Sequence, residues 1–316
     1  MVEGQNGLTW PLWKALAVEV ERLGFAGLYR SDHYTNPVTP DKDSLELWVS
    51  LTWLADRTER LRFGPIVSPV TFRHPALSAR MGLQVDDLSG GRLTLGLGAG
   101  WQEREHHMFG MPLLDVKSRM DRFEEAMALV HRLVHSDQPV TMEGRYYQVR
   151  EAVLLPRRWW TERRDGAGPS MPLLVGGNGE KRTLPLAARY ADEWNGVVVS
   201  PGRFTELNAR LDALLDGIGR PRSAVRRSLM HGVTYGADQA MLARALEWRA
   251  CNWSSRADAD QMRERGEIVG AGEEVVHQIA AYEAAGVQCL MLQWLPIEEL
   301  DLLRHFASVV ARWLRP

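Results

Sequence analysis

The order of hydrophobic patterns along the chain is the feature that most constrains its fold. Short apolar runs alternate with amphipathic stretches of helical period over most of the length. Near the start, "AVEVERLGFAGLYRS" has the order helix, glycine-containing stop and buried strand, and "QIAAYEAAGVQCLMLQ" near the end repeats it. Repeated units of this kind form a parallel sheet covered by helices. The pattern therefore predicts an α/β protein.

The number of units narrows the fold further. If the short apolar run in "MVEG" is the first strand, the chain has eight strands and about as many helices, which predicts a (β/α)8 TIM barrel. A doubly wound open sheet is the alternative. A chain of 316 residues has room for two domains, but one α/β barrel of this size is equally allowed. We expect a single domain over residues 1–316.

Two segments depart from the repeat. Residues 139–171 have the pattern of a hairpin followed by a charged loop, and residues 237–270 that of helical material between the last two barrel units. Insertions that follow barrel strands border the active site, so we expect these two to form a lid at the C-terminal face. Solvated decoration or a contact between subunits is the alternative.

Composition excludes several classes of partner. The net charge is −2 with both signs interspersed, so no basic surface for nucleic acid is expected. No apolar stretch reaches ~18 residues, and the first residues lack the pattern of a signal peptide, so we expect a cytoplasmic protein outside the membrane. Cys251 and Cys289 fit no CxxC or zinc spacing, and we interpret both as packing residues.

The active site of a parallel barrel lies at the carboxyl ends of its strands. The predicted strand ends hold Asp32, His33, Val67, Ser68, Gly98, Gly100, Trp101, Gly176, Gly177, Asn178, Gly179 and Asn195. A histidine in such a position can transfer a proton near neutral pH. Neighbouring residues of a strand point to opposite faces, so Asp32 need not contact His33. The alternative is an aspartate that caps the next turn and a histidine that fills the rim.

Two further strand ends suggest a ligand. In "FGPIVSPVTFRHP", Pro65 occupies a place where a strand should donate a hydrogen bond, so the strand is bent, bulged or close to a cis bond, unless the segment is an ordinary loop. In "LTLGLGAGW", Gly98 and Gly100 would let a planar ligand approach the backbone.

The segment "LLVGGNGEKRTL" predicts an anion site. A strand ends in Gly176–Gly179 and a helix is expected to begin at Glu180, so free N–H groups and the helix dipole would meet a phosphate. A plain glycine-rich turn is the alternative. We expect no metal site, because His106 and His107 are adjacent and the chain contains no HExxH motif.

Five segments together resemble the luciferase-like monooxygenase superfamily, and more closely its coenzyme F420-dependent oxidoreductase branch. They are "GFAGLYRSDHY", "FGPIVSPVTFRHPALSA", "LSGGRLTLGLGAGWQEREHHMFG", "VGGNGEKRTLPLAARYADEWN" and "GVQCLMLQWL". The resemblance covers nearly the whole chain and implies a (β/α)8 barrel with a lid region. It implies F420 as cofactor, with FMN as the alternative, and hydride transfer to or from a small organic substrate. It also makes a homodimer plausible.

The resemblance assigns roles to individual residues. His33 would transfer the proton, and Asp32 would hydrogen-bond the cofactor. Ile66, Val67 and Ser68 belong to the family's bulged strand, which carries a non-proline cis bond behind the cofactor ring; the bond itself, between Gly64 and Ser68, is left open. Gly98 and Gly100 would lie near the ring, and Gly176, Gly177, Asn178 and Gly179 would hold the phosphate of the tail.

One position departs from the family pattern. Sugar-phosphate dehydrogenases of this branch carry a glutamate directly after the Gly-x-Gly strand end, where this chain has Trp101. Trp101 would form an apolar wall over the ring. This predicts a flatter, less polar substrate than a sugar phosphate.

Overall fold

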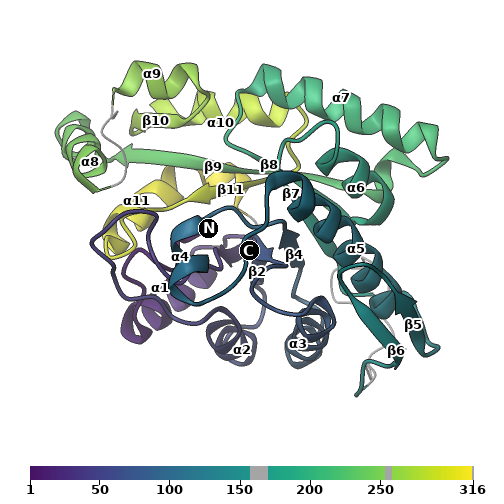
Figure 1. Cartoon of the computed structure of the whole chain (residues 1–316). Helices are drawn as coiled ribbons and strands as arrows, with labels where there is room; N and C mark the ends of the chain where they lie inside the picture. Colours follow the sequence, from purple (N-terminus) through teal and green to yellow (C-terminus); the bar gives the residue numbers. More distant parts are fainter. Residues whose placement is uncertain (157–169, 253–257, 315–316) are drawn as a thin grey trace.

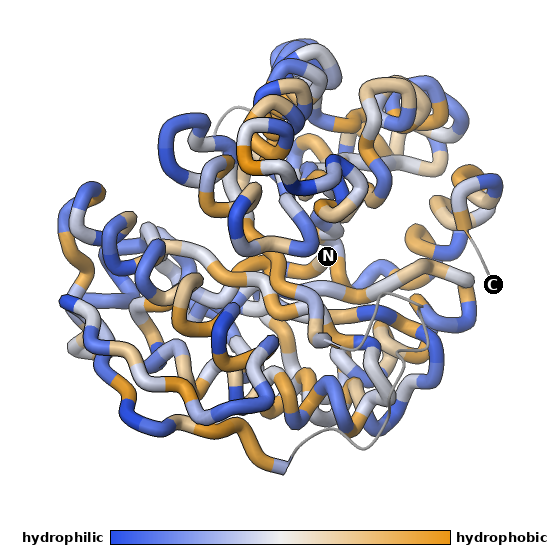
Figure 2. Tube along the Cα trace, turned by 90° about the vertical axis from the view of Figure 1, so that its right-hand side faces the viewer, coloured by the Kyte–Doolittle hydropathy of each residue, from blue (hydrophilic) through white to orange (hydrophobic). Residues whose placement is uncertain are grey.

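The structure is a computed structural model that describes residues 1–156, 170–252 and 258–314. Most strands occupy the middle of the molecule and most helices lie outside them (Figure 1). Figure 2 shows long hydrophobic stretches in the centre and hydrophilic residues on the outer turns. The amino terminus lies near the middle in both views.

The helices alternate with strands over most of the chain, as the pattern predicts. They are α1 (Trp10–Arg22), α2 (Leu47–Arg57), α3 (Pro75–Leu88), α4 (Glu103–Met108), α5 (Val116–His135), α6 (Thr183–Tyr190), α7 (Pro201–Gly217), α8 (Gln239–Asn252), α9 (Ala259–Glu264), α10 (Glu274–Ala284) and α11 (Leu300–Val309). The first shows why these segments are helical. Trp13, Leu16 and Val20 form its buried face. Gly24, whose φ is +81°, ends it as predicted.

The strands are short. They are β1 (Gly27–Arg30), β2 (Arg62–Pro65), β3 (Ser68–Pro69), β4 (Leu95–Gly98), β5 (Val140–Glu143), β6 (Gln148–Ala152), β7 (Leu173–Gly176), β8 (Glu193–Val197), β9 (Arg226–Gly236), β10 (Ile268–Ala271) and β11 (Cys289–Gln293). The strand that contains Pro65, predicted to be bent, bulged or close to a cis bond, is divided into β2 and β3, and the Ile66–Val67 peptide between them is cis. The strand expected in "MVEG" is reduced to one bridge between Val2 and Arg30.

The described strands form three sheets. β1 pairs with β2, and a seven-stranded sheet has the order β10-β9-β8-β7-β4-β3 with β11 on β9. Every pair in these two sheets is parallel. Apart from β10, neighbours follow the chain order without the reversal that a doubly wound sheet requires. The predicted α/β class is confirmed, and this strand order disfavours the doubly wound alternative.

The two insertions lie in different places. Residues 139–171 begin with the antiparallel hairpin of β5 and β6, as the pattern predicts, whereas the charged loop lies partly outside the described residues. The carboxylate of Glu125 on α5 accepts from the N–H groups of Tyr146 and Tyr147, so the hairpin packs along α5 (Figure 1). The described part of this segment therefore differs from a lid over the strand ends, because it follows a helix and not a strand.

The second insertion does follow a strand. Residues 237–270 contain α8, α9 and most of β10, and residues 253–257 lie outside the described part. A cavity of about 530 Å³ lies between α8 and the loops that follow the first and last strands, with Lys42, Tyr235 and Trp248 among its lining residues.

Candidate functional site

Asp32 follows β1 and is held by groups from the neighbouring strand and loop. Its side chain is buried, and Ser68 Oγ donates to Asp32 Oδ2 at 2.7 Å. Arg73 donates to the same oxygen at 2.6 Å and bridges to Glu46 at 2.7 Å. The negative charge of Asp32 is therefore compensated and its orientation fixed before any ligand binds.

His33 has a different partner from its neighbour. Its Nδ1 lies 2.8 Å from Oε1 of Glu105, and the backbone N–H of Tyr34 donates to the other oxygen of this carboxylate at 3.0 Å. Glu105 is fully buried on α4. Burial lowers the pKa of His33, but the hydrogen bond and charge of Glu105 outweigh it, so this pKa is raised above its ordinary value. Nε2 is then the ring nitrogen left for another partner.

The break between β2 and β3 brings three strand ends together. The side chain of Val67 packs against the ends of β4 and β7. A Cβ on Gly98 would meet a methyl group of Val67 at 2.4 Å, and one on Gly176 would meet the other at 2.9 Å. Glycine is therefore required at both positions for Val67 to sit at the centre of the strand ends.

Trp101 lies beside the histidine. Gly100, whose φ is +83°, turns the chain after β4, and Trp101 follows with its side chain 60% exposed. The centroid of its ring is 5.6 Å from that of His33, with the planes at 80°. This edge-on contact leaves most of the indole exposed beside the histidine.

The glycine loop after β7 is anchored to β8. Gly177 has a φ of +124° and its N–H donates to the carbonyl of Asn195 at 2.9 Å. The side-chain Nδ2 of Asn178 donates to the carbonyl of Val197 at 2.6 Å, and the Oδ1 of Asn178 accepts from the backbone N–H of Val197 at 2.9 Å. The side chain of Asn178 is therefore used to hold the loop, and its backbone is the part left for a ligand.

The helix after this loop begins later than predicted. Residues 180–182 form a turn and α6 starts at Thr183, because Arg182 has φ −129° and ψ −52°, outside the helical region. Arg182 bridges to Asp121 and Glu124 on α5 at 2.8 and 3.1 Å, which directs its charge away from the loop.

Sequence reasoning missed the partners of the predicted residues. Glu105 and Arg73 were not among the candidates, and neither was Glu3, a buried carboxylate after the first short strand. Glu3 accepts from Gln5 at 2.9 Å and from Gln293 at 2.6 Å. The signal available was position: Arg73 and Glu105 each follow a predicted strand by a few residues, and Glu3 lies within the predicted first strand. Asn195, which was considered, is buried with its Oδ1 unpaired among the described residues.

The comparison with known protein families leads to the same fold. The sequence model of the luciferase-like monooxygenase family matches residues 4–289, and the chain belongs to this family. The F420-dependent glucose-6-phosphate dehydrogenase of Beutenbergia cavernae is 33% identical over 257 residues, 77% of this chain and 68% of the relative.

Two other proteins extend the comparison. The 4-hydroxyprotoasukamycin monooxygenase of Streptomyces nodosus subsp. asukaensis is 24% identical over 335 residues, 96% of this chain and 86% of its own. The solved structure of the coenzyme F420-dependent tetrahydromethanopterin reductase from Methanopyrus kandleri has a TM-score of 0.79 at 17% identity, covering 99% of this chain and 98% of that one. This likeness supports the fold. Among the helices of the described residues, none is long and apolar enough to cross a membrane.

Proposed function

We propose that the protein is an F420-dependent oxidoreductase that transfers a hydride between the deazaflavin and a small organic substrate. The observation that supports this proposal is the hydrogen-bonded pair of His33 and Glu105 at the carboxyl ends of the strands. The pair lies beside Asp32 and beside Val67, whose side chain packs against the ends of β4 and β7 and forms the floor of the site. The relatives named as F420-dependent glucose-6-phosphate dehydrogenases support the choice of cofactor.

We also infer that the sheets close into a (β/α)8 barrel. Two isolated bridges extend the pairing beyond the named strands: Val2 pairs with Arg30 of β1, and Phe63 of β2 pairs with Leu93, two residues before β4. Met1 donates to the carbonyl of Leu292 and accepts from the N–H of Trp294, so the first residues lie between β1 and β11. These contacts connect β1 to β2, β4, β7, β8, β9, β11 and back to β1, which is the circuit that a barrel requires.

The residues fit a deazaflavin. The ring would lie against Val67, whose side chain occupies the space beside Gly98 and Gly176, with Asp32 at the edge of the ring. The tail phosphate would meet the backbone of Gly177–Gly179, where φ of +124° at Gly177 excludes a side chain. When bound, F420 supplies a carbon centre that gives or takes a hydride. Ile66 and Ser68 complete the floor through the backbone and the hydrogen bond to Asp32.

His33 transfers a proton to or from the substrate. Since Glu105 occupies Nδ1, the proton that is exchanged with substrate is the one on Nε2. The raised pKa keeps the imidazole protonated to higher pH than an ordinary histidine, so it serves as an acid when the substrate is reduced. In the reverse direction the neutral form is needed, and a higher pH favours it.

Trp101 supports a substrate class. The indole places an apolar wall beside His33 where a catalytic carboxylate would stand in sugar-phosphate enzymes. A planar carbonyl, imine or enone suits this wall better than a sugar phosphate does. The cavity of about 530 Å³ beside α8, for which α8 would act as the lid, is lined by aromatic side chains and also by Lys42, Arg244 and Arg249, so it expresses no such preference.

FMN-dependent monooxygenation is the second candidate. The similarity to the 4-hydroxyprotoasukamycin monooxygenase favours it. FMN carries a single phosphate on a shorter tail, and the same glycine loop would serve it. Oxygen uptake with reduced FMN distinguishes the two candidates.

The deciding experiment is a fluorescence titration of the ligand-free protein with oxidised F420 and, separately, with FMN. We expect micromolar binding of F420, weak binding of FMN, and loss of F420 binding in Gly177→Asp, which strains the backbone and places a carboxylate beside the phosphate. Gly202→Ala on α7 is the control, since a Cβ there meets nothing within 4 Å. Preference for FMN would replace the proposal by the second candidate. The homodimer stays a prediction, which light scattering tests.

A further inference from the structure

A buried carboxylate at the carboxyl ends of the strands has no role in the proposed reaction. Glu3 is 7% exposed, and it accepts from Nε2 of Gln5 at 2.9 Å and from Nε2 of Gln293 at 2.6 Å. Both donors are neutral amides. Within the part of the chain that the structure describes, Glu3 forms no ion pair.

Other buried carboxylates of the protein have a cation beside them. Those that contact an arginine or a histidine are Glu19, Asp32, Glu105 and Glu267. Glu193 lies 3.9 Å from Arg226. Because removing a carboxylate from water is costly unless a cation compensates it, Glu3 is left with a negative charge that a ligand can balance.

Arg30 is a buried cation that packs against this segment, but it does not contact the carboxylate of Glu3. A Cβ on Gly4 would clash with Nη2 of Arg30, so the guanidinium lies against the backbone of Gly4. Its hydrogen bonds go to the backbone oxygens of Ser31 and Leu45 and to the hydroxyl of Ser50. Neighbouring residues of a strand point to opposite faces, and Tyr29 faces the interior, so Arg30 points towards the helices.

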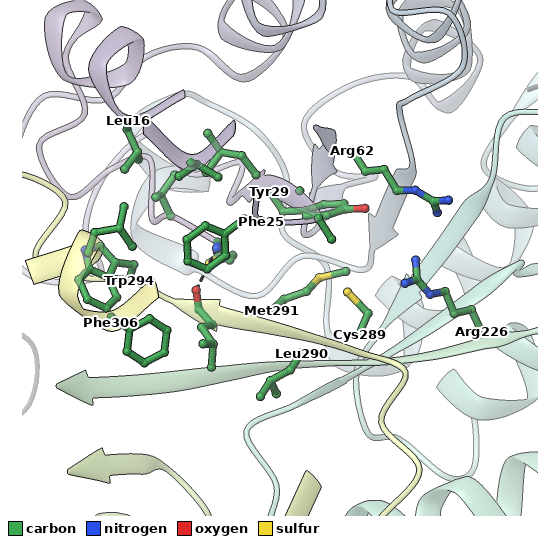
Figure 3. A pocket seen from close by; sticks show the side chains of 18 residues that line it. Leu16, Phe25, Tyr29, Arg62, Arg226, Cys289, Leu290, Met291, Trp294 and Phe306 are labelled. Atoms are coloured by element: carbon green, nitrogen blue, oxygen red, sulfur yellow. Dashed lines mark hydrogen bonds between the residues drawn. The ribbon is translucent and has the colours of Figure 1, made fainter. Parts of the chain in front are cut away.

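The interior between the strands shows where Glu3 points. Tyr29 and Met291 belong to the interior cluster, and Figure 3 shows both side chains between β1 and β11. Gln293, two residues after Met291 on β11, faces the same way. Met1 packs against this cluster, so Glu3, two residues further on, also faces the interior. The carboxylate and the amide of Gln293 therefore lie above the interior cluster, towards the carboxyl ends of the strands.

Gln293 adds a second acceptor. Its Nε2 donates to Glu3, so its Oε1 is the accepting side of the amide, and this oxygen has no partner among the described residues. The residues that follow Gln5 and Gln293 in the chain, Asn6 and Trp294, line the cavity of about 530 Å³. A carboxylate and an amide oxygen side by side are a suitable pair of acceptors for a positively charged N–H group.

Glu3 also lies near the proposed acid. Burial lowers the pKa of His33, Glu105 raises it most, and the charge of Glu3 adds to that rise. The backbone N–H of Gly4 donates to Oγ of Ser31 at 2.9 Å, which joins the segment of Glu3 to the end of β1 just before His33. The carboxylate and the imidazole therefore belong to one site.

We infer, on the basis of the proposed function, that the substrate is a cationic nitrogen compound, and that Glu3 and Gln293 bind its N–H group. It is an iminium in the direction of reduction and the corresponding amine in the reverse direction. The indole of Trp101, 60% exposed beside His33, suits the same ligand because an aromatic face attracts positive charge.

The reaction balances with such a substrate. An imine that enters neutral takes the proton from Nε2 of His33 on its nitrogen, and its carbon takes the hydride of the reduced cofactor. One N–H and one C–H bond form as the C=N double bond becomes single, and the proton that the cofactor releases on oxidation restores the imidazolium. Glu3 exchanges no proton in this sequence and stabilises the positive charge on nitrogen before the hydride is added.

The test compares a cyclic amine with its neutral isostere. Tetrahydroisoquinoline is a cation near neutral pH, and isochroman has an ether oxygen in place of the N–H group. NMR titration of the cofactor-free protein measures both dissociation constants. We expect the amine to bind about 10–100-fold more tightly than the ether, as hydrogen bonds to a charged group allow.

Three variants locate the preference. Glu3→Gln should remove it, and Gln293→Met, which deletes one acceptor and keeps the charge, should lower it in part. Glu193→Gln is the matched control, because it changes a buried carboxylate at the opposite ends of the strands and should keep the preference. The Tm of each variant reports whether it is folded, and the ratio in the parent protein decides where Glu3→Gln does not fold.

Equal binding of amine and ether by the parent protein, or an undiminished preference in folded Glu3→Gln, would overturn the inference. Glu3 would then serve only to hold Gln5 and Gln293. The F420 titration separates this result from the proposed function, because neither Glu3 nor Gln293 is assigned to the cofactor. F420 binding without a preference for the amine removes the inference alone, whereas a preference without F420 binding retains the cation site and removes the proposed function.

Discussion

The two ends of the strands differ in how closely their buried charged side chains are paired. At the carboxyl ends, charged groups from different strands are paired, Asp32 with Arg73 and His33 with Glu105. At the amino ends, Glu193 is buried 3.9 Å from Arg226, with its Oε1 unpaired among the described residues, and burial raises the pKa of this carboxyl. At the carboxyl ends Asp32 and His33 therefore each have a close partner of opposite sign, whereas at the amino ends burial of Glu193 outweighs the charge of Arg226 and favours the neutral carboxyl.

The largest effect of removing a paired charge is expected at His33, at the carboxyl ends of the strands. His33→Ala removes the proposed acid and should lower kcat by about 10²–10⁴-fold while F420 still binds. His107→Ala is the control, because this histidine lies on the same rim with its side chain exposed. Steady-state kinetics on a reducible substrate, with the F420 titration alongside, would measure both. An unchanged kcat in His33→Ala would remove the proton role.

Glu105→Gln tests whether the negative charge of Glu105 raises the pKa of His33. The variant keeps a hydrogen-bonding group but loses the charge, so the pKa of His33 should fall. Reductive activity requires the protonated form, so it should decline at a lower pH than in the parent, with a loss of about tenfold at pH 8. NMR titration of the imidazole measures the shift directly. Glu103→Gln on the same helix should leave the profile in place.

A third change probes the floor of the site. A Cβ at Gly98 would meet Val67 at 2.4 Å, so Gly98→Ala should cost about 1–3 kcal/mol in the free energy of unfolding and weaken F420 binding. Gly202→Ala, in open space on α7, should instead stabilise by about 0.5–1 kcal/mol. Urea unfolding measures the free energy of unfolding of both variants. Equal effects would mean that Val67 moves aside without cost.

The smallest effect is expected at the other end of the strands. Glu193→Gln should leave activity unchanged and raise stability at pH 7 by about 0–1 kcal/mol. The raised pKa gives the sign: above the unfolded pKa the ionised carboxyl destabilises the fold, so the gain should shrink as pH falls towards 4.5. Unfolding at several pH values checks this. A clear loss of stability at pH 7 would show that the attraction of Arg226 outweighs the burial of the carboxylate.

The sequence predicted what depends on local pattern and missed what depends on distant partners. Alternating periods placed the helices and most strands, because burial of one face imposes them. Asp32, His33 and the glycines could be predicted as site residues because they follow strands, and the structure places them at strand ends; their roles stay a prediction. Glu105 was missed because it lies 72 positions from His33, and nothing local in "EREHH" indicates which of its acidic residues is buried. The start of α6 at Thr183 and the position of the cis bond depend on packing that periodicity does not report.

The chain order of the site residues has a consequence for how such an enzyme can change. His33 and Glu105, the pair proposed to transfer the proton, belong to the first third of the chain, and the glycine loop with its anchors on β8 belongs to residues 176–197. Recombination between the two parts could exchange the element that grips a cofactor tail while retaining the acid. The molecule is in this sense modular, and a shift from one flavin-like cofactor to another need not disturb the imidazole and its carboxylate.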